Sequence, residues 1–196
     1  MKELLLIDCC VRGKDSRTRK LADAFLEGLD RKAFHFTELC PEAEGMLPLT
    51  GANFAQREKL VAEGQLDHPR FHYAHQFAQA DVVVFAAPMW ELSFPAILKV
   101  YIENVSVRGV TFGNDADGVF GSCRGSRLVF LTTRGERYAD NDLEQGSRYL
   151  EAMAQFFGFH HYSCVSADGL DAAGADPRIL LADACGRARG LAGSLS

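Results

Sequence analysis

The chain has 196 residues, 47% hydrophobic and 24% charged, so it is long enough to bury one substantial core and too short for two. Its 21 basic and 26 acidic residues give a formal net charge of −5, which provides no general attraction to nucleic acid or to an anionic membrane. We therefore expect a single domain over residues 1–196, without nucleic-acid or membrane partners.

Two features of the sequence predict a cytoplasmic protein. The apolar run after Met1 is too short for a signal-peptide core, and no segment approaches the length of a membrane span. The six cysteines contain no CxxC pair. In a reducing compartment they are expected to be packed thiols rather than a disulfide or zinc framework.

Strand and helix patterns alternate along the chain. Short apolar or β-branched runs predict strands over residues 3–7, 33–39, 82–87, 127–133 and 162–167. Helical spacing with start and stop signals predicts helices over residues 16–29, 53–65, 69–79, 95–105, 146–157 and 177–191. This alternation implies right-handed crossovers and a parallel sheet with helices on both faces. Residues 40–51, rich in glycine and proline, are predicted to be a long surface loop. Residues 109–125, with five glycines, are predicted to be a less regular region that rims the pocket or a subunit contact.

The first candidate site is residues 8–18, DCCVRGKDSRT, which follow the first strand. N–H groups at the start of the next helix are free, the helix dipole adds positive potential, and the Ser16 and Thr18 hydroxyls can donate. The segment is therefore predicted to hold a phosphate. It contains neither GxGxxG nor GK[ST], which weakens the dinucleotide and NTPase interpretations. The alternative is a plain helix cap at Asp15 or Ser16 beside solvated basic residues.

The second candidate site follows the strand over residues 82–87 and is bracketed by Pro88 and Pro95. Each proline disfavours helical geometry in the residue before it, which leaves backbone N–H groups between them free to face a ligand. Met89 and Trp90 provide an apolar shelf at the carboxyl end of a strand, and such a shelf suits an aromatic cofactor. The alternative for Trp90 is a core or dimer-contact aromatic.

The third candidate site is residues 132–136, after the fourth strand. Gly135 allows a sharp turn with exposed backbone donors. Arg134 either supplies positive charge to an electron-rich ring edge or is an ordinary surface residue. The three segments follow strands one, three and four, which are neighbours if the strand order is 2-1-3-4-5. We therefore predict that they converge on one site.

Three motifs resemble those of a known family. They are CVR with SRT at residues 10–12 and 16–18, AAPMWELSFPAILKVYIE at residues 86–103, and TRGE at residues 133–136. With them the chain is similar, nearly end to end, to the flavodoxin-like NAD(P)H dehydrogenases, in particular the FMN-dependent NADH-azoreductase (quinone reductase) family. The resemblance implies a flavodoxin-like α/β three-layer sandwich, with a five-stranded parallel sheet of order 2-1-3-4-5 and helices on both faces.

The resemblance also implies a function. The implied protein is an FMN-dependent oxidoreductase that passes two electrons from NADH or NADPH through the flavin to a quinone or azo acceptor. The resemblance also implies that it is a homodimer. The flavin carries the chemistry, so no catalytic side chain is expected. In this resemblance the phosphate contacts are Cys10, Ser16, Arg17 and Thr18. The ring contacts are Pro88, Met89, Trp90, Glu91, Leu92, Thr133, Arg134 and Gly135.

The chain departs from the family pattern in these loops. Cys10 stands in place of a serine and is a weaker donor, and Val11 stands in place of a proline. Glu91 replaces an asparagine and Glu136 a glycine, so both add negative charge. These changes motivate the alternative function, a flavodoxin-fold interaction or regulatory module with weak or lost flavin binding. A one-electron flavodoxin-type carrier is disfavoured because the chain is only mildly acidic.

Two further clusters are interpreted as structural. A bridge between the adjacent Cys9 and Cys10 would need a distorted backbone, so packed thiols are expected there. His68, His72 and His75 share one helical face, and such a face is more often solvated than metal-binding. We predict no metal site.

Overall fold

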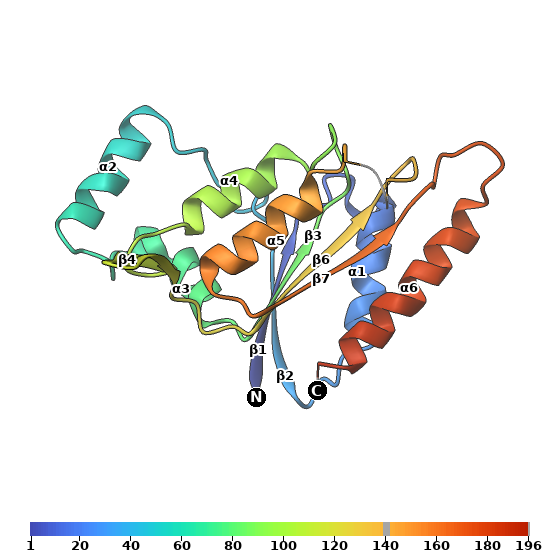
Figure 1. The fold of residues 1–196 in the computed structure, drawn as a ribbon, viewed down its shortest axis with the longest axis horizontal. Helices are drawn as coiled ribbons and strands as arrows, with labels where there is room; N and C mark the ends of the chain where they lie inside the picture. The colour runs from blue at the N-terminus through green and yellow to red at the C-terminus, as the bar shows by residue number, and fades with distance from the viewer. Residues whose placement is uncertain (139–141, 196) are drawn as a thin grey trace.

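The computed structural model describes residues 1–138 and 142–195. Five parallel strands form the central sheet in the order β2-β1-β3-β6-β7, as Figure 1 shows. They are Lys2–Asp8 (β1), Phe34–Leu39 (β2), Val82–Ala86 (β3), Arg127–Thr133 (β6) and His161–Ala167 (β7). The predicted order 2-1-3-4-5 is confirmed, because β6 and β7 are the fourth and fifth strands of this sheet.

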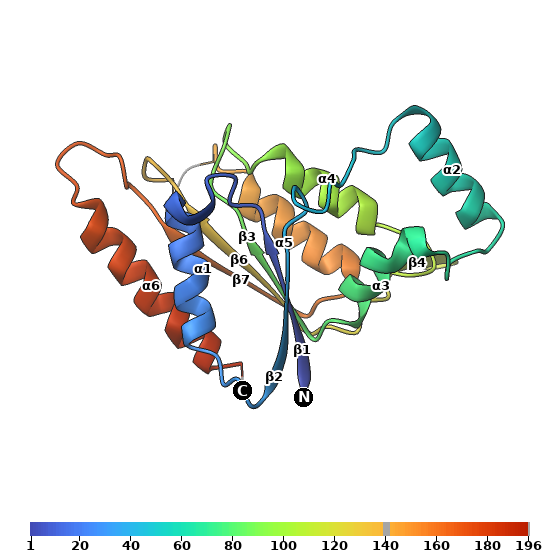
Figure 2. The ribbon, with the colours of Figure 1, turned by 180° about the vertical axis from the view of Figure 1, so that it is seen from behind.

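Helices cover both faces of the sheet (Figures 1 and 2). One face carries α1 and α6, and the other carries α3, α4 and α5, while α2 lies outside α4 and buries only Leu60. The bounds are Arg17–Glu27 (α1), Gly51–Ala62 (α2), His72–Gln79 (α3), Ala96–Val105 (α4), Gly146–Phe157 (α5) and Pro177–Gly193 (α6). Short 3-10 turns, Gly13–Asp15 (η1) and Pro69–Phe71 (η2), precede α1 and α3.

The central strands divide the interior into two apolar layers. Side chains of successive strand residues point to opposite faces. Leu5 and Val83 therefore belong to the core under α3, α4 and α5, whereas Leu4 and Val84 belong to the core under α1 and α6. Because β1 and β3 are covered on both faces, their sequences are continuously apolar, and this is the signal that predicted them.

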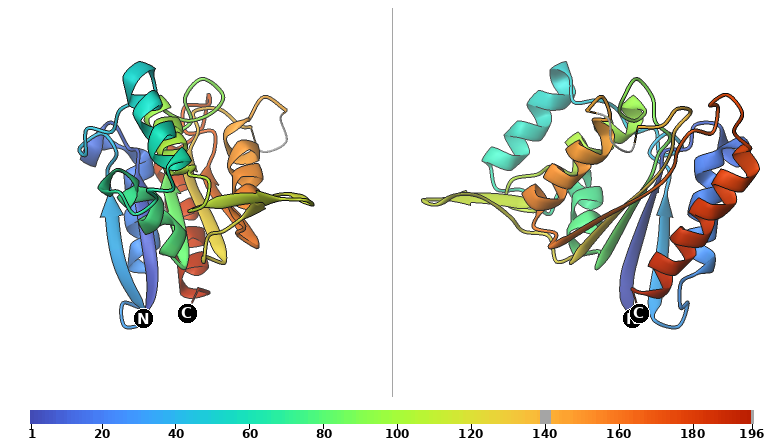
Figure 3. Two further views of the ribbon diagram at one scale, coloured as in Figure 1. Left: turned by 90° about the vertical axis from the view of Figure 1, so that its left-hand side faces the viewer. Right: turned by 45° about the vertical axis from the view of Figure 1, so that its right-hand side comes forward.

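The expectation of an irregular region over residues 109–125 is wrong in part, because this stretch contains a β-hairpin. Phe112–Asp115 (β4) pairs antiparallel with Gly118–Gly121 (β5), and the hairpin extends away from the sheet (Figure 3). Glycine is a weak strand former, which hid the pattern. One of these glycines has a packing role, since a Cβ on Gly113 would meet the Phe120 ring at 2.5 Å.

The remaining sequence clusters have local structural roles. All six cysteines are free thiols, with Cys9 and Cys10 buried. The His72 and His75 rings contact the carbonyl oxygens of Pro69 and Leu66 at 3.1 and 2.9 Å. None of the helices in the described ranges combines the length and apolar character that a membrane crossing requires.

Gly28 tests the packing of α1 on α6. A Cβ at this position would lie 2.5 Å from the Arg189 carbonyl oxygen, and its φ of −81° is open to any residue, so the penalty is steric. Gly28→Ala should lower the free energy of unfolding by about 1–3 kcal/mol, measured by urea titration. Gly186 lies inside α6, and a Cβ at this position would meet no atom within 4 Å. Gly186→Ala should therefore raise the free energy of unfolding by about 0.5–1 kcal/mol. A Gly28→Ala variant as stable as the wild type would contradict this close contact.

Candidate functional site

The three predicted segments meet at the carboxyl edge of the sheet, the upper edge in Figure 1. The Met89 N–H donates to the Thr133 carbonyl oxygen at 3.0 Å. The Thr18 and Thr133 hydroxyls lie 2.6 Å apart in the interior, which joins the first segment to the third. Together the segments surround a cavity of about 290 Å³. Its lining residues are Val11, Arg12, Ser16, Arg17, Pro88, Met89, Trp90, Thr133, Gly135 and Asp171.

One end of this cavity has the features of an anion site. Ser16 is the N-cap of α1, and its Oγ accepts from the Arg19 N–H at 3.3 Å. The cap and the anion site are therefore compatible, because the cap uses the Arg19 N–H and leaves the hydroxyl proton of Ser16 and the N–H groups of Arg17 and Thr18 as donors. Arg12 and Arg17 both line the cavity and add positive charge.

A partly buried carboxylate shapes the turn that precedes this helix. Asp8 accepts from the Cys10 backbone N–H at 2.8 Å through one oxygen and from Arg19 at 2.8 Å through the other. Arg19 also pairs with Asp23 at 2.8 Å and with Glu38 on β2. Sequence reasoning missed this cluster. The signal was an acidic residue at a strand's carboxyl end with an arginine in the next helix.

Cys10 and Thr18 lie beside the cavity rather than in its wall. The Cys10 thiol is buried and lies 3.7 Å from the Ala86 carbonyl oxygen, to which it donates. Burial first, and then the Asp8 charge, raises the pKa of this thiol far above its usual value, so it stays neutral. Thr18 is also buried and directs its hydroxyl at Thr133. Both side chains join the first segment to the sheet.

The second segment is a tight turn in an uncommon conformation. Trp90 and Ser93 exchange backbone hydrogen bonds at 3.3 and 2.8 Å, and the two residues between them have positive φ, 45° at Glu91 and 66° at Leu92. Positive φ is costly for residues other than glycine and tends to occur at functional sites. Pro88, Met89 and Trp90 line the cavity, whereas the Glu91 and Leu92 side chains do not.

In the third segment, Arg134 does not line the cavity, although the residues on either side of it do. Thr133 and Gly135 line the cavity, but the Arg134 side chain is buried away from it. Its guanidinium pairs with Asp168 at 3.1 Å and with Glu144 at 3.4 Å. The structure therefore does not present this charge to the cavity, and Arg134 is not a surface residue either.

A fourth segment, after β7, was not expected from the sequence. Asp171 lines the cavity, and its backbone N–H donates to the Gly135 carbonyl oxygen at 2.8 Å. Its carboxylate forms two hydrogen bonds with Arg17, at 2.8 and 2.9 Å. Because β7 lies next to β6 in a parallel sheet, its carboxyl end reaches the same edge, and that placement was the available signal.

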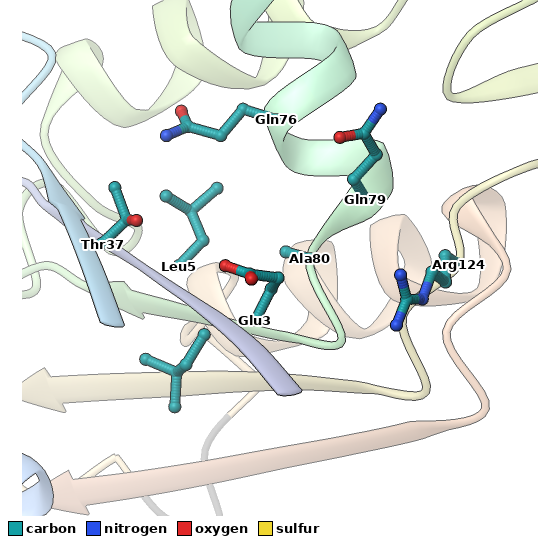
Figure 4. Close-up of a pocket in the computed structure, with 8 residues that line it drawn as sticks. Glu3, Leu5, Thr37, Gln76, Gln79, Ala80 and Arg124 are labelled. Carbon is teal, nitrogen blue, oxygen red and sulfur yellow. The ribbon is translucent and has the colours of Figure 1, made fainter. Parts of the chain in front are cut away.

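A second cavity, of about 300 Å³, lies beside the amino-terminal half of β1 (Figure 4). Its charged groups already have partners. Glu3 contacts His35 at 2.7 Å, and Arg124 pairs with Asp81 at 3.1 Å. It lacks the two cavity-lining arginines and the capped helix start of the first cavity, so the carboxyl edge is the better anion site.

The residues at the carboxyl edge fit FMN. The first turn of α1, with Ser16, Arg12 and Arg17, could hold a phosphate. Met89 and Trp90 lie in the same cavity and provide an apolar surface for a planar ring. Anion donors and an aromatic surface therefore occur in one cavity, as a flavin mononucleotide requires.

Comparisons with known proteins give concordant matches. A family model described as "Flavodoxin-like fold" matches residues 2–188. The FMN-dependent NADH:quinone oxidoreductase 2 of Clostridium acetobutylicum is 36% identical over 179 residues, 89% of each chain. The FMN-dependent NADH:quinone oxidoreductase of Clostridium perfringens is 35% identical over 187 residues, again 89% of each chain. The crystal structure of an FMN-dependent NADH-azoreductase from Bacillus anthracis in complex with FMN has the same fold, with a TM-score of 0.87, 21% identity and coverage of 100% of this chain and 99% of that one.

The positive φ at Glu91 predicts which substitutions stabilise the turn. Glu91→Gly and Glu91→Asn should raise the free energy of unfolding, glycine by about 1 kcal/mol, because both residues adopt the left-handed region more readily. Glu91→Gln removes the charge and keeps the longer side chain, so it should leave the urea midpoint unchanged. Equal stabilisation by all three variants would assign the effect to charge instead of backbone conformation.

Proposed function

Because this chain belongs to the flavodoxin-like family that includes FMN-dependent NADH:quinone oxidoreductases, we propose that it catalyses the same class of reaction. It would pass two electrons from NADH or NADPH through FMN to a quinone or azo acceptor. The observation that carries this proposal is that the capped start of α1 and the Met89–Trp90 surface line one cavity. The family relationship expected from the sequence motifs is confirmed.

In this proposal the side chains bind and orient, and bound FMN supplies the two-electron chemistry. Ser16, Arg17 and the first-turn N–H groups of α1 hold the phosphate. Met89 and Trp90 contact the ring, and the backbone at Thr133 and Gly135 closes the third side.

In this scheme, the other residues implied by the resemblance hold the turns around the cavity in place. Cys10 and Thr18 fix the phosphate turn from within the core, and Arg134 fixes the third turn through its two carboxylates. Glu91 and Leu92 contribute the turn conformation that leaves their backbone N–H groups free to face the ring. No protein nucleophile or proton donor is required.

The purified protein should be yellow, release FMN on denaturation and lose its flavin absorbance when titrated anaerobically with NADH. Added quinone should restore the absorbance. Trp90→Ala should weaken FMN binding about tenfold through loss of an aromatic contact. Phe54→Ala is the matched control, because Phe54 is 47% exposed against 48% for Trp90 and lies away from the cavity. Protein that stays colourless after soaking in FMN would favour the interaction-module alternative.

We further propose that the protein is a cytoplasmic homodimer. Its six free thiols suit a reducing compartment. An apolar hollow of about 640 Å³ beside the second segment, in which the Phe94 and Tyr149 rings lie 5.7 Å apart, supports a self-contact. So does the hairpin, which exposes Val119 and Phe120.

Sedimentation velocity should give twice the chain mass of 21.5 kDa. Val119→Asp, at a site 62% exposed on the hairpin, should shift the protein toward monomer by placing a charge in the contact. Ile179→Asp, at a site 67% exposed at the start of α6, is the control and should leave the mass unchanged. A monomeric wild type would contradict the dimer.

A further inference from the structure

Asp171 forms an ion pair with Arg17, the arginine that the function proposed above assigns to the FMN phosphate. Arg17 directs both terminal nitrogens at the two Asp171 oxygens, at 2.8 and 2.9 Å, and Nη1 also lies 3.5 Å from the Leu170 carbonyl oxygen. Both residues line the cavity at the start of α1. A carboxylate and a phosphate each present two oxygens to a guanidinium in the same paired geometry, so they compete for the same donors.

Hydrogen bonds hold the backbone of Asp171 at the cavity. Its N–H donates to Gly135 at 2.8 Å, and the following Ala172 N–H donates to Gly169 at 3.2 Å. The hydrogen bonds from Arg17 also hold the pKa of the Asp171 carboxyl below its usual value, so the group is ionised at neutral pH. An arriving phosphate therefore meets a negative charge and an arginine that is already paired.

We propose that Asp171 competes with the FMN phosphate for Arg17 and thereby limits how tightly the protein holds its cofactor. This inference rests on the function proposed above. The competition is moderate, because the Arg17 and Asp171 side chains are 35% and 59% exposed and water screens the pair. The expected consequence is a dissociable flavin whose affinity is set from outside the three family motifs.

Flavin fluorescence titrations with FMN and with riboflavin test this proposal. Asp171→Asn should lower the FMN dissociation constant about five- to tenfold, mainly because it frees Arg17 and to a smaller extent because it removes a repelling charge. Riboflavin has no phosphate, so its affinity should change less than twofold. Asp183→Asn is the matched control, because Asp183 forms an exposed pair with Arg187 at 3.1 Å on α6 and does not line the cavity.

The Arg17→Met background separates competition for Arg17 from simple repulsion. There the gain from Asp171→Asn should fall below twofold, because no guanidinium remains to be released. Weaker FMN binding by Asp171→Asn, an equal gain with riboflavin, or a gain unchanged by Arg17→Met would each overturn the competition. An FMN dissociation constant that is unchanged by Asp171→Asn would overturn this inference alone. If neither the wild type nor any variant binds FMN, the proposed function is overturned as well.

Discussion

The parallel pairing of β1 with β3 and of β3 with β6 is the constraint on which the site depends. In this register Ile7 pairs with Phe85 and Phe85 with Phe130, so the three strands end at one level. The pairing continues into the loops, where Cys9 donates to Ala86 at 2.8 Å and Ala87 to Leu131 at 3.1 Å. A dry core on both faces fixes the register, because a slip by one residue would turn every apolar side chain to the wrong layer.

Beyond the strands, buried and partly buried polar groups position the segments. Thr18 and Thr133 satisfy each other in the interior, and Asp8 anchors the Cys10 backbone and Arg19. Such groups are costly to bury unless they are paired, so each pair specifies one arrangement of the loops. Arg17, by contrast, lies at the cavity and is only partly buried.

Two features at this rim run against local preference. Glu91 and Leu92 adopt positive φ without being glycines, and an acidic residue, Asp171, stands where an anion is expected. Local conflicts of this kind are retained where surrounding structure holds them, and they concentrate at functional sites. Here the hydrogen bonds between Trp90 and Ser93 and between Asp171 and Gly135 hold them.

Periodicity and turn residues, which are encoded locally, predicted the bounds of α5 and the three loops that carry the motifs. The strand order was implied by the resemblance of these motifs to those of a known family. Four features are set by packing between elements and not by local sequence: the hairpin, the inward-facing Cys10 thiol, the burial of Arg134 and the position of Asp171 at the cavity. The hairpin depends on the close approach of Gly113 to Phe120, and the other three features depend on a partner distant in sequence. Arg17 and Asp171, for example, are separated by 154 positions. Local patterns fix which residues leave a strand's end, but packing between elements fixes which side chains meet there.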